Sequence, residues 1–157
     1  MHEKIEDAIT ELLDGELLLN ALNLTAYLNE NHLSPIMSCW GKIPFNEYYL
    51  GRMGVEGKSE WVFEIFNFLD FGDFIDEDEE FKQTVYDHVY ICEAPCHDEC
   101  WRAKDVKIFG KEFKSVCSQH SRAFINPDRK TIEHIKKLIE YSKKTKPYPQ
   151  QYHPTHH

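Results

Sequence analysis

The spacing of apolar residues changes along the chain, and this change constrains the fold more than any other feature of the sequence. Near both ends apolar residues recur every three or four positions, as on one face of a helix. Between residues 36 and 74 the period falls towards two, as in strands. We therefore expect an α+β fold with two N-terminal helices, a small and mostly antiparallel sheet, a middle acidic helix, a cysteine-bound hairpin and a C-terminal helix.

The N-terminal third predicts two helices separated at Asp14-Gly15, a dipeptide typical of chain breaks. Residues 3–13 place five apolar side chains on one face, namely Ile5, Ala8, Ile9, Leu12 and Leu13. Residues 16–31 are apolar around much of the helix circumference, so we expect this second helix to be largely buried.

Two aromatic segments in the middle of the chain predict strands. These are "NEYYLGRM" (46–53) and "EWVFEIFNF" (60–68), with the turn-forming "GVEGKS" between them. In the second segment Trp61, Phe63 and Ile65 alternate with residues that face the other way. The pattern indicates an antiparallel pair.

The segment "DFGDFIDEDEEF", residues 70–81, contains seven acidic residues, and we call it the acidic segment. It lacks the ligand spacing and the central glycine of an EF-hand loop. Carboxylates at the start of a helix are favoured by the helix dipole, so we expect Asp76 to cap a helix over Glu77–Val89. Its inward residues would be Phe81, Val85 and Val89.

The C-terminal part predicts a hairpin and a final helix. Residues 106–116 would turn at Gly110-Lys111, and Asn126 and Pro127 are suited to the cap and the first position of the helix that follows. The core stripe of that helix is Ile132, Ile135, Leu138 and Ile139, and His134 would point outward. We expect one domain over residues 1–146 and a disordered Pro-rich tail over 147–157.

Charge is distributed unevenly. The formal net charge is −9, but residues 1–101 carry 5 Lys and Arg against 22 Asp and Glu, while residues 102–157 carry 13 against 5. A basic half of this kind is compatible with nucleic-acid binding, but such binding relies on basic patches without opposing acids. We favour the interpretation that the two oppositely charged parts lie against each other or are solvated.

Three cysteines stand four residues apart in "CEAPCHDEC", and 16 residues separate the last of them from Cys117. Structural zinc sites often join two ligand-bearing loops across a hairpin through four thiolate or imidazole groups. We therefore predict a zinc site formed by Cys92, Cys96, Cys100 and Cys117, with His97 and His120 as alternates. The other readings are redox-active thiols, although CxxC is absent, or an iron–sulfur cluster.

The segments "ICEAPCHDECWRAKDVKIFGKEFKSVC" and "FINPDRKTIEHIKKLIEYSKK" resemble a group of small proteins of clostridia and related anaerobes. Members of that group combine a short cysteine cluster, a phrase like "IFGKEF", a further cysteine and an NPD-capped, Lys-rich final helix. The resemblance covers about the last 65 residues well and the first 90 in outline. It implies that the four cysteines are important, and it implies no activity.

The catalytic motifs GxSxG, HExxH, the P-loop and GxGxxG are all absent, so the sequence leans away from catalysis. Aromatic residues are dense between 40 and 74, and such residues fill cores more often than they line pockets. If a small-molecule pocket exists there, its expected lining is Trp40, Tyr48, Tyr49 and Trp61, with Glu47 or Arg52 as polar anchors.

Three functional hypotheses follow. The first is a small-molecule-binding or regulatory module with a structural zinc site. The second is a thiol- or metal-dependent enzyme or redox sensor that uses the cysteine cluster. The third is an acidic protein-interaction module, which requires the acids of residues 70–80 to form one exposed face with the basic half turned away. Five cysteines without a signal peptide or a long apolar run favour the cytoplasm and exclude a membrane span.

Overall fold

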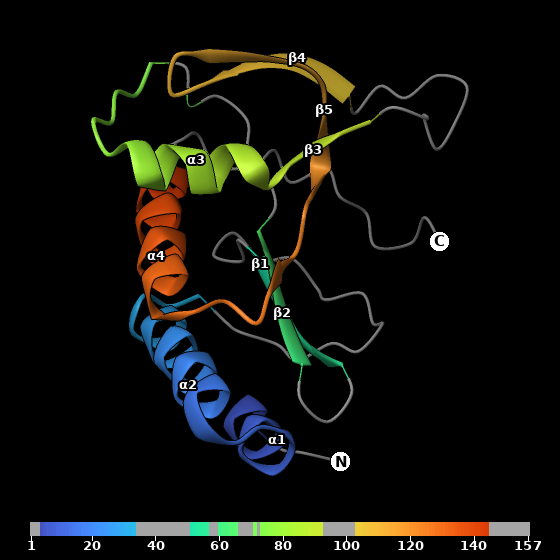
Figure 1. Cartoon of the computed structure of the whole chain (residues 1–157), viewed down its shortest axis with the longest axis vertical. Helices are drawn as coiled ribbons and strands as arrows, with labels where there is room; N and C mark the ends of the chain where they lie inside the picture. The colour runs from blue at the N-terminus through green and yellow to red at the C-terminus, as the bar shows by residue number, and fades with distance from the viewer. Residues whose placement is uncertain are drawn as a thin grey trace.

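The chain folds into four described helices and six described strands (Figure 1). The computed structural model describes residues 4–33, 51–56, 60–65, 71, 73–92 and 103–144, with the backbone alone at 51–56, 60, 65 and 117–121. The helices are α1 (Ile5–Leu12), α2 (Gly15–Glu30), α3 (Glu79–Asp87) and α4 (Arg129–Lys144). The strands are β1 (Gly51–Glu56), β2 (Glu60–Ile65), β3 (Val89–Ile91), β4 (Ala103–Ile108), β5 (Lys111–Ser121) and β6 (Phe124–Ile125).

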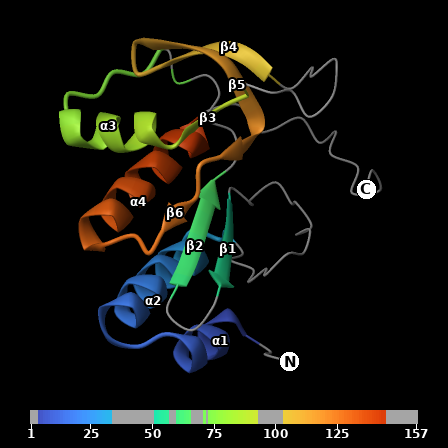
Figure 2. The same ribbon diagram turned by 45° about the vertical axis from the view of Figure 1, so that its right-hand side comes forward.

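The described strands form two three-stranded sheets in which all paired strands are antiparallel. One sheet has the order β1-β2-β6, and the other has the order β3-β5-β4 with the long strand β5 in the centre. Figure 2 shows β6 beside β2, while β4 and β5 lie above α3 and α4. The α+β prediction is therefore confirmed.

The core joins the helices to both sheets. Its most deeply buried side chains include Trp61 and Phe63 of β2, Phe81 of α3, Ile108 of β4 and Ile135 of α4. The predicted stripe of α4 is buried at all four of its positions, and Phe81, Val85 and Val89 point inward as expected. Burying apolar surface is the main favourable contribution to folding, so this shared core ties elements from the two halves of the chain together.

The positions of α1 and α2 agree with the prediction, but the starts of α3 and α4 differ by two residues. Asp78, not Asp76, caps α3, because its Oδ1 accepts a hydrogen bond of 3.1 Å from the amide of Phe81. Asp128 takes the equivalent role in α4, with Oδ1 accepting from the amide of Thr131 at 2.8 Å. Asn126, which we predicted as the cap, instead has a φ of 46° and accepts at Oδ1 from the amide of Trp61.

Two further predictions about strands were wrong. The hairpin turns at Phe109-Gly110 rather than Gly110-Lys111, since Ile108 pairs with Lys111. The first strand includes Gly54 to Glu56, which we expected in a loop, because these residues pair in register with β2. Residues 46–50 lie outside the described residues. The short strands β3 and β6 were not predicted, and β3 takes Val89 away from the predicted helix.

The tail over residues 147–157 also lies outside the described residues. Among the helices that the structure describes, none combines the length and the apolar character needed to cross a bilayer.

Candidate functional site

Two of the four predicted zinc ligands lie at neighbouring positions of the β3-β5-β4 sheet, one just after β3 and one in β5. Cys92 directly follows β3, and its amide donates a hydrogen bond of 2.8 Å to the carbonyl of Ser115 in β5. Cys117 lies two residues further along β5, where its backbone pairs with Ala103 of β4. The central strand therefore brings Cys117 next to both the end of β3 and the start of β4.

The sheet is irregular at this location. The pairing of β3 with β5 shifts between Val89 and Ile91, and the pairing of β4 with β5 shifts between Lys104 and Val106. Ser115 has a φ of 56°, and its amide donates to the Asp105 carboxylate at 3.0 Å instead of to a ladder carbonyl. Bulges redirect side chains and are frequent beside functional sites, so this distortion distinguishes the cysteine end of the sheet from its regular hairpin end.

The remaining predicted metal ligands are not placed. Cys96, Cys100 and the alternate ligand His97 lie outside the described residues, and His120 is described by its backbone in β5. Cys92 is half-buried. Within the described ranges, no three His, Cys, Asp or Glu side chains gather in a way that would hold a metal ion. Zinc binding therefore stays a prediction.

Among the residues of the predicted aromatic pocket, Trp61 is the one whose side chain the structure describes. Trp40, Glu47, Tyr48 and Tyr49 lie outside the described residues, and Arg52 is described by its backbone, opposite Glu64 in the β1–β2 pair. Trp61 is completely buried in the core. No hydrogen-bond partner for its indole Nε1 is found in the described part of the chain.

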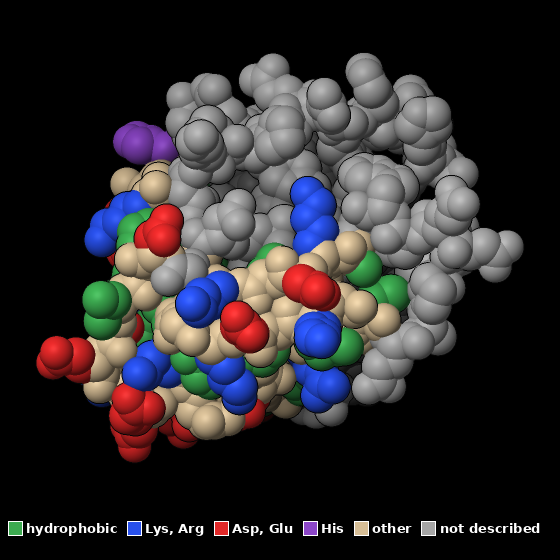
Figure 3. Space-filling view, turned by 90° about the horizontal axis from the view of Figure 1, so that it is seen from above, with side chains coloured by type: hydrophobic (Ala, Val, Ile, Leu, Met, Phe, Trp, Pro, Cys, Tyr) green, Lys and Arg blue, Asp and Glu red, His purple; other side chains and the backbone are tan. Residues whose placement is uncertain are grey.

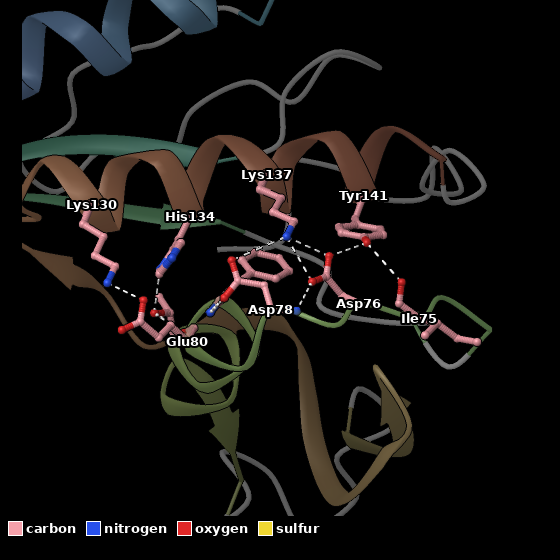
Figure 4. A network of polar contacts seen from close by, with 10 residues as sticks. Ile75, Asp76, Asp78, Glu80, Lys130, His134, Lys137 and Tyr141 are labelled. Carbon is pink, nitrogen blue, oxygen red and sulfur yellow. Dashed lines mark hydrogen bonds and ion pairs between the residues drawn. The ribbon is translucent and has the colours of Figure 1, made fainter.

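The acidic segment lies against the basic helix α4 (Figure 4). The side chain of Asp76 is 7% exposed, and its carboxylate accepts a hydrogen bond of 2.6 Å from the Tyr141 hydroxyl and lies 2.9 Å from Nζ of Lys137. Glu80 forms an ion pair with Lys130, about two helical turns closer to the start of α4 than Lys137. This arrangement matches our expectation that oppositely charged parts contact each other, and it counts against an acidic face with the basic half turned away.

His134 also contributes to this contact between α3 and α4. We predicted that it points outward, but its ring is half-buried, with Nδ1 2.8 Å from the Thr84 hydroxyl and the ring edge-on to Phe81. The prediction was wrong because α3 covers the side of α4 that helical periodicity alone left open.

Burial and hydrogen bonding act in opposite directions on Asp76. Burial alone would raise the pKa of its carboxyl group, but hydrogen bonds from Tyr141 and Lys137 outweigh it, so the pKa lies below the ordinary value. For Tyr141 the two causes act together, and burial followed by the hydrogen bond to Asp76 raises the pKa of its hydroxyl to about 12. The pair is therefore an ionised carboxylate and a neutral phenol over a wide pH range.

Charges of both signs alternate over β4. Lys104, Asp105 and Lys107 are exposed there, and on the described part of the face in Figure 3 the Lys and Arg side chains are interspersed with Asp and Glu. The described part of this face therefore lacks the unopposed basic patch that nucleic-acid binding uses.

A second polar site, which the sequence did not predict, lies where α2 and α4 begin. An open pocket of about 360 Å³ is lined by Asp14, Gly15, Glu16, Leu17 and Asn20 of α2 and by Asn126 and Asp128 before α4. Further along α2 the Tyr27 hydroxyl donates to Glu140 of α4, so the two helices run parallel and start at the same end. The only sequence signals at this site are the chain break at Asp14-Gly15 and the capping residues before α4.

Comparison of the chain with protein-family models, with curated proteins and with solved structures found no match.

Proposed function

We propose that the chain is a small-molecule-binding or regulatory module whose C-terminal half is held together by a structural Zn²⁺ bound to Cys92, Cys96, Cys100 and Cys117. The observation that carries this proposal is the register of the β3-β5-β4 sheet. It brings the backbone of Cys92, directly after β3, beside the strand that contains Cys117, 25 positions further along the sequence.

Chain length supports the participation of a third cysteine. Ala103 pairs with Cys117, and Cys100 precedes Ala103 by three residues. Three residues extend over at most about 11 Å, so Cys100 cannot be far from the Cys117 strand. Cys96 lies in the connection between Cys92 and Cys100. Four thiolates within one short connection and one adjacent strand are the donor set that structural zinc prefers.

The position of the cluster favours a structural role. β3 contains only three residues, and its ladder to β5 is irregular. A short strand of this kind gains little from pairing alone. A metal that joins the chain after β3 to β5 would replace packing that the segment lacks, as structural zinc does in small domains. Because four protein ligands would close the coordination sphere, this arrangement favours the structural reading over the thiol- or metal-dependent enzyme.

The test is the metal content of the chain in which His153, His156 and His157 are replaced by Ala, which removes adventitious tail ligands. Elemental analysis and native mass spectrometry should find one equivalent of zinc. Replacement by Co²⁺ should give the intense thiolate-to-cobalt absorption of a site with several sulfur ligands. Cys117→Ser should lose the metal and the cooperativity of unfolding, because the folding free energy of such sites includes the binding free energy.

Cys39→Ser is the matched control, since it removes the cysteine outside the proposed set and should retain the zinc. His97→Ala and His120→Ala test the alternate zinc ligands. Loss of zinc from either variant would mean that the replaced histidine takes the place of one cysteine in the proposed ligand set. Protein that folds cooperatively without metal, or that keeps its zinc in Cys92→Ser and Cys117→Ser, would overturn the proposal. Visible absorption of the purified protein would instead indicate an iron–sulfur cluster.

A further inference from the structure

The pocket between the starts of α2 and α4 contains donors that the protein does not use. Asp14 precedes α2 as its cap residue, yet its side chain accepts no hydrogen bond from the first turn. The first amide of α2 with a helical acceptor is that of Leu18, which donates to the Asp14 carbonyl at 3.2 Å. The amides of Gly15, Glu16 and Leu17 therefore rely on solvent or a ligand, because the first amides of a helix have no acceptor within the helix.

Asn20 provides an independent indication of a ligand. It lines the same pocket and is 7% exposed, and no residue in the described part of the chain hydrogen-bonds to its side-chain amide. Its amide atoms are not among the fully enclosed polar atoms of the described residues, so they face the open pocket, and asparagine is a poorer helix former than leucine or alanine. Helix propensity therefore does not explain an asparagine at this position, whereas a ligand in the pocket would bond to its amide.

The charges around the pocket determine the chemistry of the ligand. Asp14, Glu16 and Asp128 are exposed around the opening, and none of them forms an ion pair with a described Lys or Arg. Three carboxylates attract a cation, whereas the positive ends of two parallel helix dipoles and the free amides attract an anion. Groups that attract a cation and groups that attract an anion occur in one pocket, so the favoured ligand carries a positive and a negative group close together.

We propose that this pocket binds a free α-amino acid. The ammonium group is held by the rim carboxylates, and the carboxylate accepts hydrogen bonds from the first-turn amides of α2 and from the side-chain amide of Asn20. Leu17 contributes an apolar contact for the ligand's side chain. The volume of about 360 Å³ lies at the lower end of the range of roughly 300–1,000 Å³ typical of ligand pockets. This inference specifies the small-molecule part of the proposed function and does not depend on zinc.

The test is a titration of the ¹⁵N-labelled full chain with pools of the L-amino acids found in proteins, followed by NMR. Binding should shift the amides of residues 14–17, 20 and 126–128. The tightest binder is then compared with its decarboxylated amine and its deaminated acid, which for leucine are 3-methylbutylamine and 4-methylpentanoate. Each compound lacks one charge-assisted interaction, so each should bind at least about tenfold more weakly than the amino acid.

Variants connect the binding to the named groups. Asn20→Leu should abolish binding and raise the melting temperature, since it removes the amide that faces the pocket and replaces asparagine by a better helix former. Glu16→Gln should weaken binding, whereas the matched control Glu30→Gln, at the far end of α2, should not. If no pool shifts these amides, if the amine binds as tightly as the amino acid, or if Asn20→Leu still binds, the proposal is overturned.

The zinc content of the same samples separates this proposal from the proposed metal site. Amino-acid binding by Cys117→Ser would show that the pocket functions without the metal. If the protein lacks zinc but its amide signals still shift with the amino acid, the proposed metal site has failed. If it contains zinc but its amide signals do not shift, the proposed amino-acid site has failed.

Discussion

Phe109 adopts a backbone conformation that its side chain does not favour. Phe109 and Gly110 are the two central residues of the β4–β5 turn, and their φ values of 46° and 83° define a type I′ turn. Glycine and asparagine are the usual residues at such positions, whereas phenylalanine there is strained. The compensation is burial, because the Phe109 ring stacks on Phe71 at 5.6 Å and meets Tyr141 edge-on at 4.8 Å.

We therefore expect Phe109→Ala to destabilise the protein by about 3 kcal/mol, since it removes a buried ring. Gly110→Ala should cost only about 1 kcal/mol, because its added Cβ meets nothing within 4 Å and only the positive φ is unfavourable. Chemical denaturation of both variants measures the difference. Equal losses would mean that the turn, not the ring, determines the contribution of this hairpin to stability.

Asp76 should make stability depend on pH in the acid range. Its pKa is lower in the folded state than in the unfolded chain, so its contribution is complete above the unfolded value and is lost as pH falls through the folded one. Asp76→Asn should cost about 2 kcal/mol at neutral pH, from the weakened bonds to Lys137 and Tyr141, and should reduce the loss below about pH 4. Asp73→Asn, which removes an exposed carboxylate of the same segment, is the control and should change neither.

The helices illustrate how far the sequence predicts an element. Apolar periodicity located all four, because it reports which side faces the core. It did not identify the caps, since several side chains before each helix are able to accept a hydrogen bond. Asp76 and Asn126 have other partners, namely Tyr141 and the Trp61 amide. These partners lie 65 residues away in the sequence, so no local pattern reports them.

The cap of α3 can be tested separately from its charge. Asp78→Ala should destabilise by about 1 kcal/mol, because the Phe81 amide loses its acceptor. Asp78→Ser retains a capping oxygen and removes only the charge facing Lys137, 3.8 Å away. It should stay within about 0.5 kcal/mol of the parent chain, since exposed ion pairs contribute little. Thermal unfolding of the two variants distinguishes the roles, and equal effects would assign the stabilisation to the ion pair instead.

Strands were predicted less completely than helices. The alternation in β2 predicted the buried positions of Trp61 and Phe63 correctly. β3 and β6 contain three and two residues, too few to show a period, and they exist because β5 and β2 supply partners. The turn of the β4–β5 hairpin was displaced by one residue, because sequence rules do not favour phenylalanine with a positive φ.

At the scale of the whole molecule, contacts between distant segments explain what the sequence could not predict. The charge asymmetry indicated that the two halves attract each other, but not that Asp76 would meet Lys137. The cysteine spacing indicated a site across a hairpin, and the register of β5 is compatible with it at Cys92 and Cys117. The pocket of Asn20 depends on parallel packing of α2 and α4, which local sequence patterns do not reveal.

The hydrogen bond between Tyr141 and Asp76 should shape both ends of the profile of stability against pH. The pKa of Tyr141 is raised to about 12 by burial and by Asp76, so the folded state keeps a proton that the unfolded chain releases near pH 10. Its contribution is complete below about pH 10 and is lost as pH rises towards about 12. Tyr141→Phe should therefore weaken the alkaline loss. It should also weaken the acid loss, because Asp76 would lose a donor that lowers its pKa.

Denaturation midpoints from about pH 3 to about pH 12 measure both effects in one series. Tyr86→Phe is the matched control, because its hydroxyl donates to the neutral carbonyl of Phe109 at 3.2 Å rather than to a carboxylate. Tyr86→Phe should lower stability by a similar amount at all acid pH values, so the dependence of stability on pH in the acid range should keep its shape. If the loss of stability at acid pH is unchanged in Tyr141→Phe, Lys137 and the Asp78 amide hold the Asp76 carboxylate ionised without Tyr141, and α4 binds the acidic segment mainly through charge.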